Sequence, residues 1–520
     1  MTKSMQHTLL ETGRHTPPAC TALGSGGGGS LRGSRRAPVC VGLCLAALAA
    51  SAGAQTLSDV IPSLFERAAT LSDPAGAGIL LDVGVDPSGI DHSLDFYGAD
   101  VSNRVREVGG ALRDRIGSEF ATPQLGDFAG ALVHDWDPES GRFERSSLLL
   151  GSPFVRRPDT LGKGMWSVAL GFSQRQFEEL DGTEISRPGF DFNLRAVDAA
   201  GDGLLTPYYE GDLIRVQSSF SLTQEIAALQ VRAGVTERLD LGVTVPFVRN
   251  ELSARVLLQM DRISTPENLR LHRFLDPRIE DDLVFAGGTL VELEDGGTSS
   301  GLGDVRVDAK YQIVDPQAGD GGLAVIVDAT VPTGDDDELL GAGGARARAG
   351  LAGSRLYGRW SPHFDVAQVV SLGDSDVFGD LPDETQLAVG VDFLANDRLT
   401  LSLDLLGRRQ TGLTTFGTSD GAFPFALSAA ANASRLAAGL APCTAAQPCV
   451  TGQDGSGANA KPELTIDRDG DATVGQVALG LRFRPARRAV VSTYFTYPLS
   501  ADEGLVDDDP VAFVGIDLSF

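Results

Sequence analysis

Pro510-Val-Ala-Phe-Val-Gly-Ile-Asp-Leu-Ser-Phe520 is the stretch that decides the expected fold. Counted back from Phe520, every second side chain is apolar, whereas Ser519, Asp517 and Gly515 fall on the opposite face. Alternation with a period of two indicates a β-strand that has one apolar and one polar face. Both a membrane β-barrel and a soluble β-sandwich can end in a strand of this kind. The rest of the chain must therefore decide between these two fold classes.

The same alternation recurs along the chain from residue 164 onward. Trp166, Val168, Leu170 and Phe172, for example, alternate with small or polar side chains. Short turns join many of these stretches in pairs, as β-hairpins require. We predict twelve strands, which cover residues 164–177, 213–236, 238–250, 302–314, 321–332, 345–358, 361–372, 384–395, 398–410, 473–484, 488–498 and 510–520.

Tight turns and long connections follow one another regularly between these strands. The long connections are the polar segments 178–212, 251–301, 333–344, 373–383, 411–472 and 499–509. Outer-membrane barrels have short periplasmic turns and long extracellular loops, and an even number of strands returns both ends to one side. A soluble sandwich has no reason to separate the two kinds of connection. We therefore predict an all-β fold: a transmembrane antiparallel β-barrel of about twelve strands over residues 161–520.

Composition and charge narrow the classes of partner. The 520-residue chain has a formal net charge of −27, which argues against nucleic acid because phosphate binding needs basic patches. A mean hydropathy of −0.01 is compatible with a barrel, because the apolar face and the polar face of each short spanning strand cancel in the mean. Beyond the N-terminal region no apolar stretch is long enough for a transmembrane helix.

Residues 1–54 are expected to be an N-terminal extension that ends in a secretory signal peptide. Arg35 and Arg36 precede an apolar run from Ala37 to Ala50. The small residues Ala52-Gly53-Ala54 then provide a cleavage site after Ala54. The low-complexity residues 1–30 leave the true start codon open.

Residues 55–160 differ from the strands that follow. Residues 61–71 and 105–116 have helical spacing, with Val105, Val108 and Ile116 on one stripe of the second helix. Loops rich in Gly, Pro and Asp surround both helices. This mixed segment is interpreted as a periplasmic extension or as a plug in the barrel lumen. A poorly ordered leader is the alternative.

Charged side chains fall on the polar faces of the predicted strands. An Arg or Lys that faced lipid at the membrane midplane would cost about 2–4 kcal/mol, so we expect these groups to face the lumen. They could fill the interior as ion pairs, or form a ladder that guides or filters a solute. The predicted lumen-facing charged residues are Arg232, Asp240, Asp304, Arg306, Asp308, Lys310, Asp328, Asp392, Asp404, Arg408, Arg482 and Asp517.

Cys443 and Cys449 are the only cysteines after the predicted signal peptide, and they are six residues apart in the long segment 411–472. In the oxidising compartment of an exported protein, such a pair indicates a disulfide. Metal binding by two cysteines without a nearby histidine is disfavoured.

Acidic clusters decorate the long connections at 280–282, 335–338 and 507–509. Asp467, Asp469 and Asp471 have the alternate spacing of a calcium loop, but Gly470 stands in the wrong place for it. We interpret these clusters as solvated tips, with bridging to lipopolysaccharide through divalent ions as an alternative. No metal site and no cofactor are predicted.

Signals for an enzyme are weak. The segments 297–301 and 417–421 match the G-x-S-x-G string, but neither lies between a buried strand and a helix, as a nucleophile elbow must. A lipid-hydrolysing barrel would need a serine paired with a histidine such as His363. We predict that the protein is not an enzyme.

Several stretches carry a family resemblance. Residues 147–172, beginning Ser147-Leu-Leu-Leu-Gly-Ser-Pro-Phe154, resemble the opening segment of outer-membrane transporters grouped with the meta-pathway phenol-degradation outer-membrane proteins. Gly234-Val-Thr-Glu-Arg-Leu-Asp-Leu-Gly-Val-Thr-Val-Pro-Phe247, Gly301-Leu-Gly-Asp304 and Val331-Pro-Thr-Gly-Asp335 are similar to motifs of that family. A more distant likeness is to the long-chain fatty-acid transporters. The terminal Phe520 resembles the closing signal that the barrel-assembly machinery reads.

This resemblance implies a barrel in the outer membrane and the passage of hydrophobic or aromatic compounds, and it supplies no catalytic residues. We expect passive transport of small solutes, with outer-membrane lipid and lipopolysaccharide as surroundings. The alternative is a structural or surface-interaction barrel with a closed lumen. The solute, the gating and the oligomeric state are left open by the sequence.

Overall fold

The computed structural model describes residues 55–71, 79–81, 99–120, 123, 125–132, 134–137, 142–145, 149–186, 189–195, 212–262, 272–274, 290–315, 321–421, 424–427, 429–450, 461–500, 504–506 and 510–520. The chain divides into two compact units, residues 1–54 and 55–520, and every described residue belongs to the second. The predicted signal peptide and its cleavage site lie outside the described residues, as do the acidic clusters at 280–282 and 507–509.

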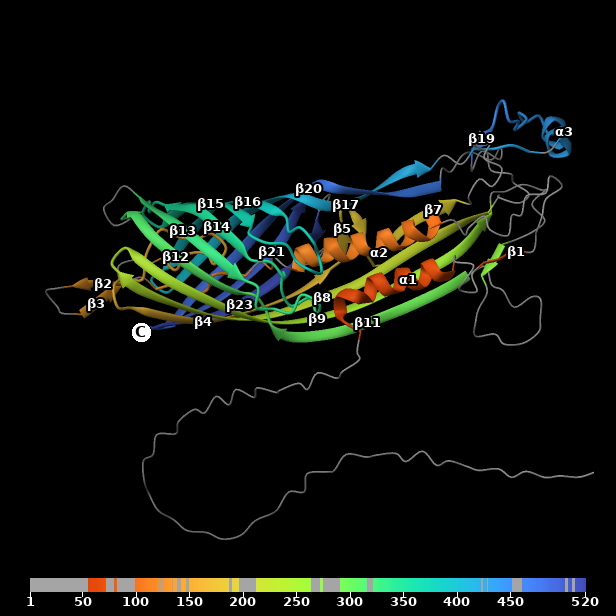
Figure 1. Ribbon diagram of the computed structural model, residues 1–520. Coiled ribbons are helices and arrows are strands. Elements are labelled where there is room, and N and C mark those ends of the chain that lie inside the picture. Colours follow the sequence, from red (N-terminus) through yellow and green to blue (C-terminus); the bar gives the residue numbers. More distant parts are fainter. Residues whose placement is uncertain are drawn as a thin grey trace, which may run out of the picture. The chain divides into compact units, whose positions relative to one another are not determined.

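Twelve strands of the described part form a closed antiparallel ring, which confirms the predicted fold class (Figure 1). The ring closes because the last strand pairs with the first, with Leu518 opposite Val168. Main-chain hydrogen bonds between Phe520 and Trp166 continue this seam at 2.8 and 3.1 Å. The strands are β4 (Trp166–Phe177), β8 (Asp212–Thr236), β9 (Leu239–Arg262), β12 (Val305–Val314), β13 (Gly322–Val331), β14 (Arg346–Ser354), β15 (Trp360–Ser371), β16 (Asp383–Asn396), β17 (Leu399–Gly421), β20 (Lys461–Ala486), β21 (Ala489–Ser500) and β23 (Val511–Ser519).

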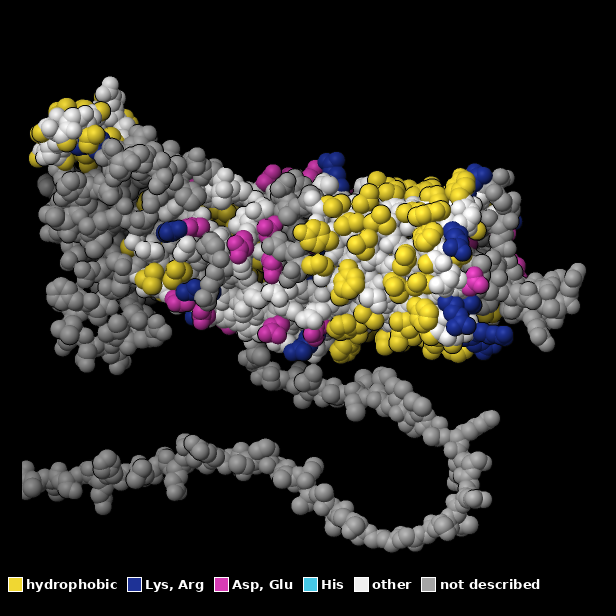
Figure 2. All heavy atoms as spheres, turned by 180° about the vertical axis from the view of Figure 1, so that it is seen from behind, with side chains coloured by type: hydrophobic (Ala, Val, Ile, Leu, Met, Phe, Trp, Pro, Cys, Tyr) yellow, Lys and Arg dark blue, Asp and Glu magenta, His cyan; other side chains and the backbone are white. Residues whose placement is uncertain are grey.

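Side chains along the ring alternate between the two faces as the sequence pattern predicts. In β23, Val514, Ile516 and Leu518 are exposed on the outside, whereas Phe513 and Asp517 are buried inside. Exposed hydrophobic side chains occur on all twelve strands of the ring and form an outer belt, and on the face drawn in Figure 2 they gather over the part of the barrel that lies away from α3. We call the end of the barrel with the tight turns the turn end, and the opposite end the loop end.

Four strands continue far beyond the belt toward the loop end. β8, β9, β17 and β20 have 23 to 26 residues each, whereas a membrane strand needs about 9–11. β11 (Leu290–Leu302) pairs with the outer half of β9, and β7 (Phe190–Arg195) pairs with β8. On this outer half the outward positions of β9 are polar, as at Glu251 and Ser253. The barrel wall is therefore taller on one side than a bilayer requires.

The predicted long loops 251–301 and 411–472 are shorter than the sequence pattern indicated. Part of the first is strand β11, and β17 continues through Gly421 to pair with residues from Lys461 onward. Register shifts at Leu413 and a left-handed Gly412 (φ 76°) interrupt the alternation there. In the outer half of β9 the alternation continues with its polarity reversed, since Leu252, Val256 and Met260 point into the apolar core. The pattern of apolar outward and polar inward residues therefore ends at the edge of the belt.

Two helices occupy the interior at the loop end. α1 (Val60–Leu71) and α2 (Ala99–Phe120) pack against each other, and α1 also contacts β9 and β11. Their apolar stripes form one core with inward side chains of the tall wall, including Phe220 and Val256. Both helices coincide with the stretches of helical spacing in the sequence. No described helix is long and apolar enough to cross a membrane.

Short elements complete the described part. They are the 3-10 turn η1 (Leu57–Asp59), helix α3 (Ala429–Ala437) and the strands β1 (Ile79–Leu81), β2 (His134–Asp137), β3 (Arg142–Arg145), β5 (Glu179–Leu180), β6 (Thr183–Glu184), β10 (His272–Phe274), β18 (Pro424–Phe425), β19 (Cys449–Val450) and β22 (Leu505–Val506).

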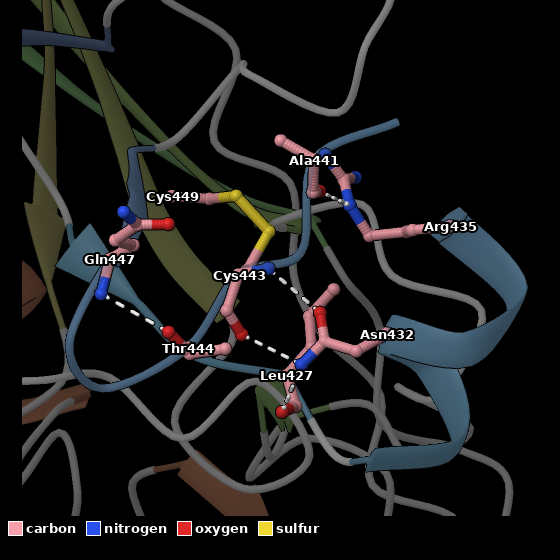
Figure 3. Close-up of a disulfide and its surroundings, with 8 residues drawn as sticks. All are labelled: Leu427, Asn432, Arg435, Ala441, Cys443, Thr444, Gln447 and Cys449. Carbon is pink, nitrogen blue, oxygen red and sulfur yellow. Dashed lines mark hydrogen bonds between the residues drawn. A yellow bond between two sulfur atoms is a disulfide. The ribbon is translucent and has the colours of Figure 1, made fainter. Parts of the chain in front are cut away.

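The predicted disulfide between Cys443 and Cys449 is confirmed (Figure 3). It closes a small knob between β17 and β20. Asn432 on α3 ties the knob together, since its side chain donates to the carbonyls of Leu427 and Cys443 at 2.9 Å and accepts from the Cys443 amide at 2.7 Å.

Gly480 gives a first test of the packing inside the barrel. The ring of Tyr494 on the neighbouring strand covers it, so a Cβ atom at this position would collide with the ring. We expect Gly480→Ala to lower the free energy of unfolding by about 1–3 kcal/mol. Gly407→Ala is the matched control on the paired strand β17, because its Cβ would meet nothing closer than 3.6 Å. Equal stabilities of the two variants in urea unfolding would contradict this packing.

Candidate functional site in the charged lumen

The lumen at the level of the belt is filled by an N-terminal segment rather than by wall side chains alone. We call the described residues 123, 125–132 and 149–165 the inner segment. Gln230 of β8 binds it at three points, accepting from the amides of Phe128 and Ala129 at 2.7 and 3.2 Å and donating to the Gly126 carbonyl at 2.7 Å. Tyr494 of β21 donates to the carbonyl of Gly151 at 3.1 Å.

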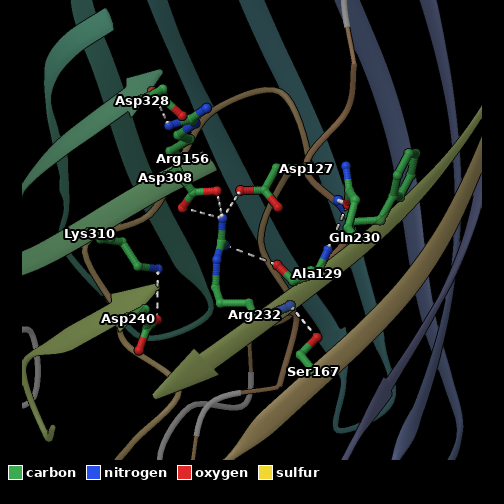
Figure 4. Close-up of polar contacts among 12 residues, drawn as sticks. Asp127, Ala129, Arg156, Ser167, Gln230, Arg232, Asp240, Asp308, Lys310 and Asp328 are labelled. Atoms are coloured by element: carbon green, nitrogen blue, oxygen red, sulfur yellow. Dashed lines mark hydrogen bonds and ion pairs between the residues drawn. The ribbon is translucent and has the colours of Figure 1, made fainter. Parts of the chain in front are cut away.

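Arg232 lies at the centre of the charged contacts between the inner segment and the wall (Figure 4). Its guanidinium group lies 2.8 Å from the carboxylate of Asp127 in the inner segment and 3.1 Å from that of Asp308 on β12. It also donates to the carbonyl of Ala129 at 3.3 Å. Burial opposes the charged form of Asp127, but Arg232 and Arg156 hold the pKa of that carboxyl well below its usual range.

Two further wall carboxylates hold the inner segment through its main chain. Asp240 accepts from the amide of Leu161 at 3.0 and 3.1 Å and lies 3.6 Å from the ammonium group of Lys310. Asp517 accepts from the amide of Ala131 at 3.0 Å. On β20, Arg482 donates to the carbonyl of Leu150 at 2.6 Å.

Asp328 is the carboxylate around which several guanidinium groups gather. Arg156 of the inner segment lies 2.8 Å from it, and Arg348 of β14 lies 3.1 Å from it. Arg348 also pairs with Asp365 of β15. Arg306 approaches Asp328 only to 3.9 Å.

A buried histidine network crosses the wall from β15 to β17. The Nε2 atom of His363 lies 2.9 Å from Asp404, and its Nδ1 atom lies 3.2 Å from the carbonyl of Ser361 and 3.4 Å from Asp392. Asp404 accepts a hydrogen bond from Ser152 of the inner segment as well. Two carboxylates and a main-chain carbonyl thus surround His363, and Asp404 links this network to the inner segment.

The helical part of the N-terminal region is attached by a second set of charges. Glu119 at the end of α2 lies 2.6 Å from Arg408 of β17 and 2.9 Å from Arg115 one turn earlier. Burial alone raises the pKa of Glu119, but the two guanidinium groups outweigh it and lower the pKa to about 2. Arg346 and Glu384 form a neighbouring pair at 3.2 Å.

Asp304 does not belong to a charge ladder, although the sequence pattern placed it on the same face as Arg306. It lies in the break between β11 and β12. Its carboxylate accepts from the amides of Thr333, Gly334 and Ala342 at 3.0, 2.9 and 2.7 Å, so it anchors the connection between β13 and β14. Nine of the other eleven predicted residues are buried, and Arg306 and Arg408 line, together with Asp304, the cavity described below.

Sequence reasoning missed several charges that complete this network. Arg346 and Arg348 alternate along β14, and Asp365 shares the inward face of β15 with His363, so the period of two could have indicated them. Asp127 and Arg156 could not be found in this way, because the inner segment has no regular period.

A cavity of about 230 Å³ lies between the inner segment and the wall. Its charged lining includes the guanidinium groups of Arg156, Arg306, Arg346, Arg348 and Arg408. Its apolar lining includes Phe120, Leu125, Phe154, Val248 and Leu340. The cavity therefore offers both apolar surface and cations to a small molecule.

The acidic clusters form no candidate metal site in the described part of the chain. No group of three or more His, Cys, Asp or Glu side chains is placed there to hold an ion. Asp336 accepts a hydrogen bond from Ser375 at 2.9 Å, and Asp471 pairs with Arg409 at 2.8 Å.

Loss of Arg232 should cost much more stability than loss of a surface arginine. Arg232→Met leaves Asp127 and Asp308 buried without their main partner, so we expect a loss of about 3–5 kcal/mol in urea unfolding. Arg249→Met is the matched control, because Arg249 is half exposed and lies 3.6 Å from Glu225. We expect the control to cost less than about 1 kcal/mol. If both variants lost a similar amount of free energy of unfolding, the ion pairs of Arg232 would not be a major source of stability.

Glu119 predicts a defined dependence of stability on pH. Its pKa is lower in the folded protein, at about 2, than its ordinary value of 4.5. The stabilisation is therefore complete above pH 4.5 and is lost as the pH falls toward 2. We expect Glu119→Gln to melt below the wild type at pH 7, and the difference in melting temperature to shrink across this interval. Glu107→Gln is the exposed control, and a difference that stays constant with pH would contradict the role of Glu119.

Comparisons with known proteins support no family assignment. No family model matches the sequence, and no curated protein matches it. Among solved structures, an outer membrane channel from Pseudomonas putida is 13% identical, with a TM-score of 0.35 over 70% of this chain and 97% of that one. The toluene transporter TodX of P. putida is 13% identical, with a TM-score of 0.28 over 77% of this chain and 99% of that one. The β domain of the Bordetella autotransporter BrkA is 11% identical, with a TM-score of 0.29 over 69% and 100%. Likenesses at this level give no evidence about what the lumen binds or carries.

Proposed function

We propose that the protein is an outer-membrane barrel through which small solutes pass passively. The belt of outward hydrophobic residues supports a place in a bilayer, since charged groups of the same strands are turned inward. The turn end would face the periplasm and the loop end the outside. The observation that carries the transport proposal is the cavity between the inner segment and the wall.

In this proposal residues 55–160 act as a plug, and its inner segment must shift before a solute passes. The contacts of the inner segment support such a movement. Many of them are hydrogen bonds and ion pairs, such as those of Gln230 and Arg232, and the apolar clusters beside them are small. Polar contacts of this kind can exchange for water when the segment moves, whereas a large apolar core would resist separation.

The ring closure gives a role to the chain end. We propose Phe520 as the closing signal for barrel assembly, because its main chain pairs with Trp166 at the seam between the last and first strands. Outer-membrane lipid around the belt and lipopolysaccharide at the loop end would be the other partners. Hydrophobic or aromatic compounds remain candidate solutes on the strength of the sequence resemblance.

A closed structural barrel is the second candidate, and one observation favours it. The inner segment and the wall pair most of the lumen charges, as at Arg232 and Asp328, so the resting lumen is well filled. A closed barrel would keep this arrangement permanently.

Conductance in planar bilayers separates the two candidates. We expect small or no steps for the full chain, and regular larger steps when residues 55–160 are deleted. Gln230→Ala tests the same point without a deletion, because it removes three contacts to the inner segment and no charge. We expect it to raise the frequency of opening, whereas Arg249→Gln on the outer surface should leave the recording unchanged. Folded, inserted variants that never conduct would favour the closed barrel.

A further inference from the structure

One of the cations that line the cavity lacks a partner at hydrogen-bonding distance. Arg306 of β12 donates no hydrogen bond to any described residue, and its nearest carboxylate, Asp328, lies 3.9 Å from its Nε atom. The two atoms that this distance joins, Arg306 Nε and Asp328 Oδ1, are buried and have no hydrogen-bond partner. About one fifth of the Arg306 side chain is accessible, and the group lines the cavity described above.

The other cavity cations are matched. Arg156 and Arg348 lie 2.8 and 3.1 Å from Asp328, Arg346 lies 3.2 Å from Glu384, and Arg408 lies 2.6 Å from Glu119. Arg306 therefore differs from its neighbours in lacking a partner at hydrogen-bonding distance.

The nearby acids do not supply a partner at hydrogen-bonding distance. The carboxylate of Asp304 accepts three main-chain amides. Asp308 pairs with Arg232, and Asp328 pairs with Arg156 and Arg348 through its Oδ2 atom while its Oδ1 atom stays 3.9 Å from Arg306. A buried guanidinium group without an anion is costly, and its planar donors fit a carboxylate in particular.

The rest of the cavity limits the size and character of the missing anion. A volume of about 230 Å³ is below the roughly 300–1,000 Å³ of pockets for drug-sized ligands, so the molecule must be small. Phe120, Phe154 and Leu340 provide apolar contact. The carboxylates of Asp304 and Asp328 also line the cavity, and their repulsion disfavours an anion with more than one negative charge.

We infer that this cavity binds a small organic monocarboxylate, whose carboxylate pairs with Arg306 and whose apolar body lies against Phe120, Phe154 and Leu340. The inference names the solute class of the proposed channel and rests on that proposed function for its transport role. The binding site itself depends only on the cavity and on Arg306. A neutral hydrocarbon would fill the apolar part of the cavity and leave the guanidinium group unpaired.

Binding to the full-length protein in detergent tests the inference without any transport. Benzoate and hexanoate are the probes, with benzyl alcohol as the neutral counterpart of benzoate and inorganic phosphate as a more highly charged anion. By isothermal titration we expect benzoate to bind at least about tenfold more tightly than benzyl alcohol, the scale of a charge-assisted hydrogen bond. Phosphate should not compete with benzoate.

Arg306→Gln supplies the critical variant, and Arg306→Lys supplies the conservative one. We expect Arg306→Gln to weaken benzoate binding by tenfold or more, to leave benzyl alcohol binding unchanged, and to lose the rise in melting temperature that benzoate gives the wild type. Arg306→Lys should restore part of the binding. Because Arg306 has no close partner to lose and its unpaired charge is costly, Arg306→Gln should fold with a melting temperature no lower than that of the wild type, in contrast to Arg232→Met.

Two results would overturn the inference: no preference for the carboxylates over benzyl alcohol, or unchanged benzoate binding by folded Arg306→Gln. Displacement of benzoate by phosphate would overturn the monocarboxylate class and point to a general anion site. If benzoate binds through Arg306 and no variant conducts, the site stands and the channel proposal fails.

Discussion

The pairing of charges across the lumen is the constraint on which the rest of the structure depends. The strands turn carboxylates and guanidinium groups inward, and each such group needs a partner because an unpaired buried charge costs several kcal/mol. The wall alone does not provide all of them. Asp127 completes the Arg232 cluster, Arg156 reaches Asp328, and main-chain amides of the inner segment reach Asp240 and Asp517. The inner segment is therefore part of the folded barrel rather than an attachment to it.

The interior has two regions that are held by different forces. At the loop end, α1 and α2 pack with the tall strands β8 and β9 in a continuous apolar core. At the level of the outer hydrophobic belt, ion pairs and hydrogen bonds hold the inner segment together with small apolar clusters. The cavity lies where the two regions meet, since Phe120 of α2 and Arg156 of the inner segment both line it.

Much of the barrel could be predicted from the sequence because each belt strand has one lipid-facing and one lumen-facing side. A period of two then fixes which residues point inward, as it does for Asp308 and Lys310 on β12. The outer half of β9 could not be predicted in this way because its polarity reverses, with polar residues outward and Val256 in the core, and β17 and β20 shift register at Leu413. Asp304 lay on the expected face, yet a two-residue break in the strand gave it main-chain partners.

The partners within the lumen could not be predicted from spacing. Arg232 and Asp127 are 105 residues apart, and Arg156 and Asp328 are 172 residues apart. Nothing local connects such residues, because their contact arises only when the ring closes around the inner segment. The same applies to His363 of β15, which meets Asp404 of β17 across the intervening strand β16.

Accessibility of spin labels along β17 in lipid vesicles tests the central claim most directly. Single labels at positions 401 to 406 should show oxygen access that rises at Leu401, Leu403 and Leu405, because these side chains are exposed on the apolar belt. Labels at Ser402 and Asp404 should be shielded from both oxygen and a water-soluble nickel complex, because the inner segment packs against that face. Equal oxygen access at all six positions, or free access of the nickel complex to 402 and 404, would contradict a closed barrel that is apolar outside and filled with paired charges inside.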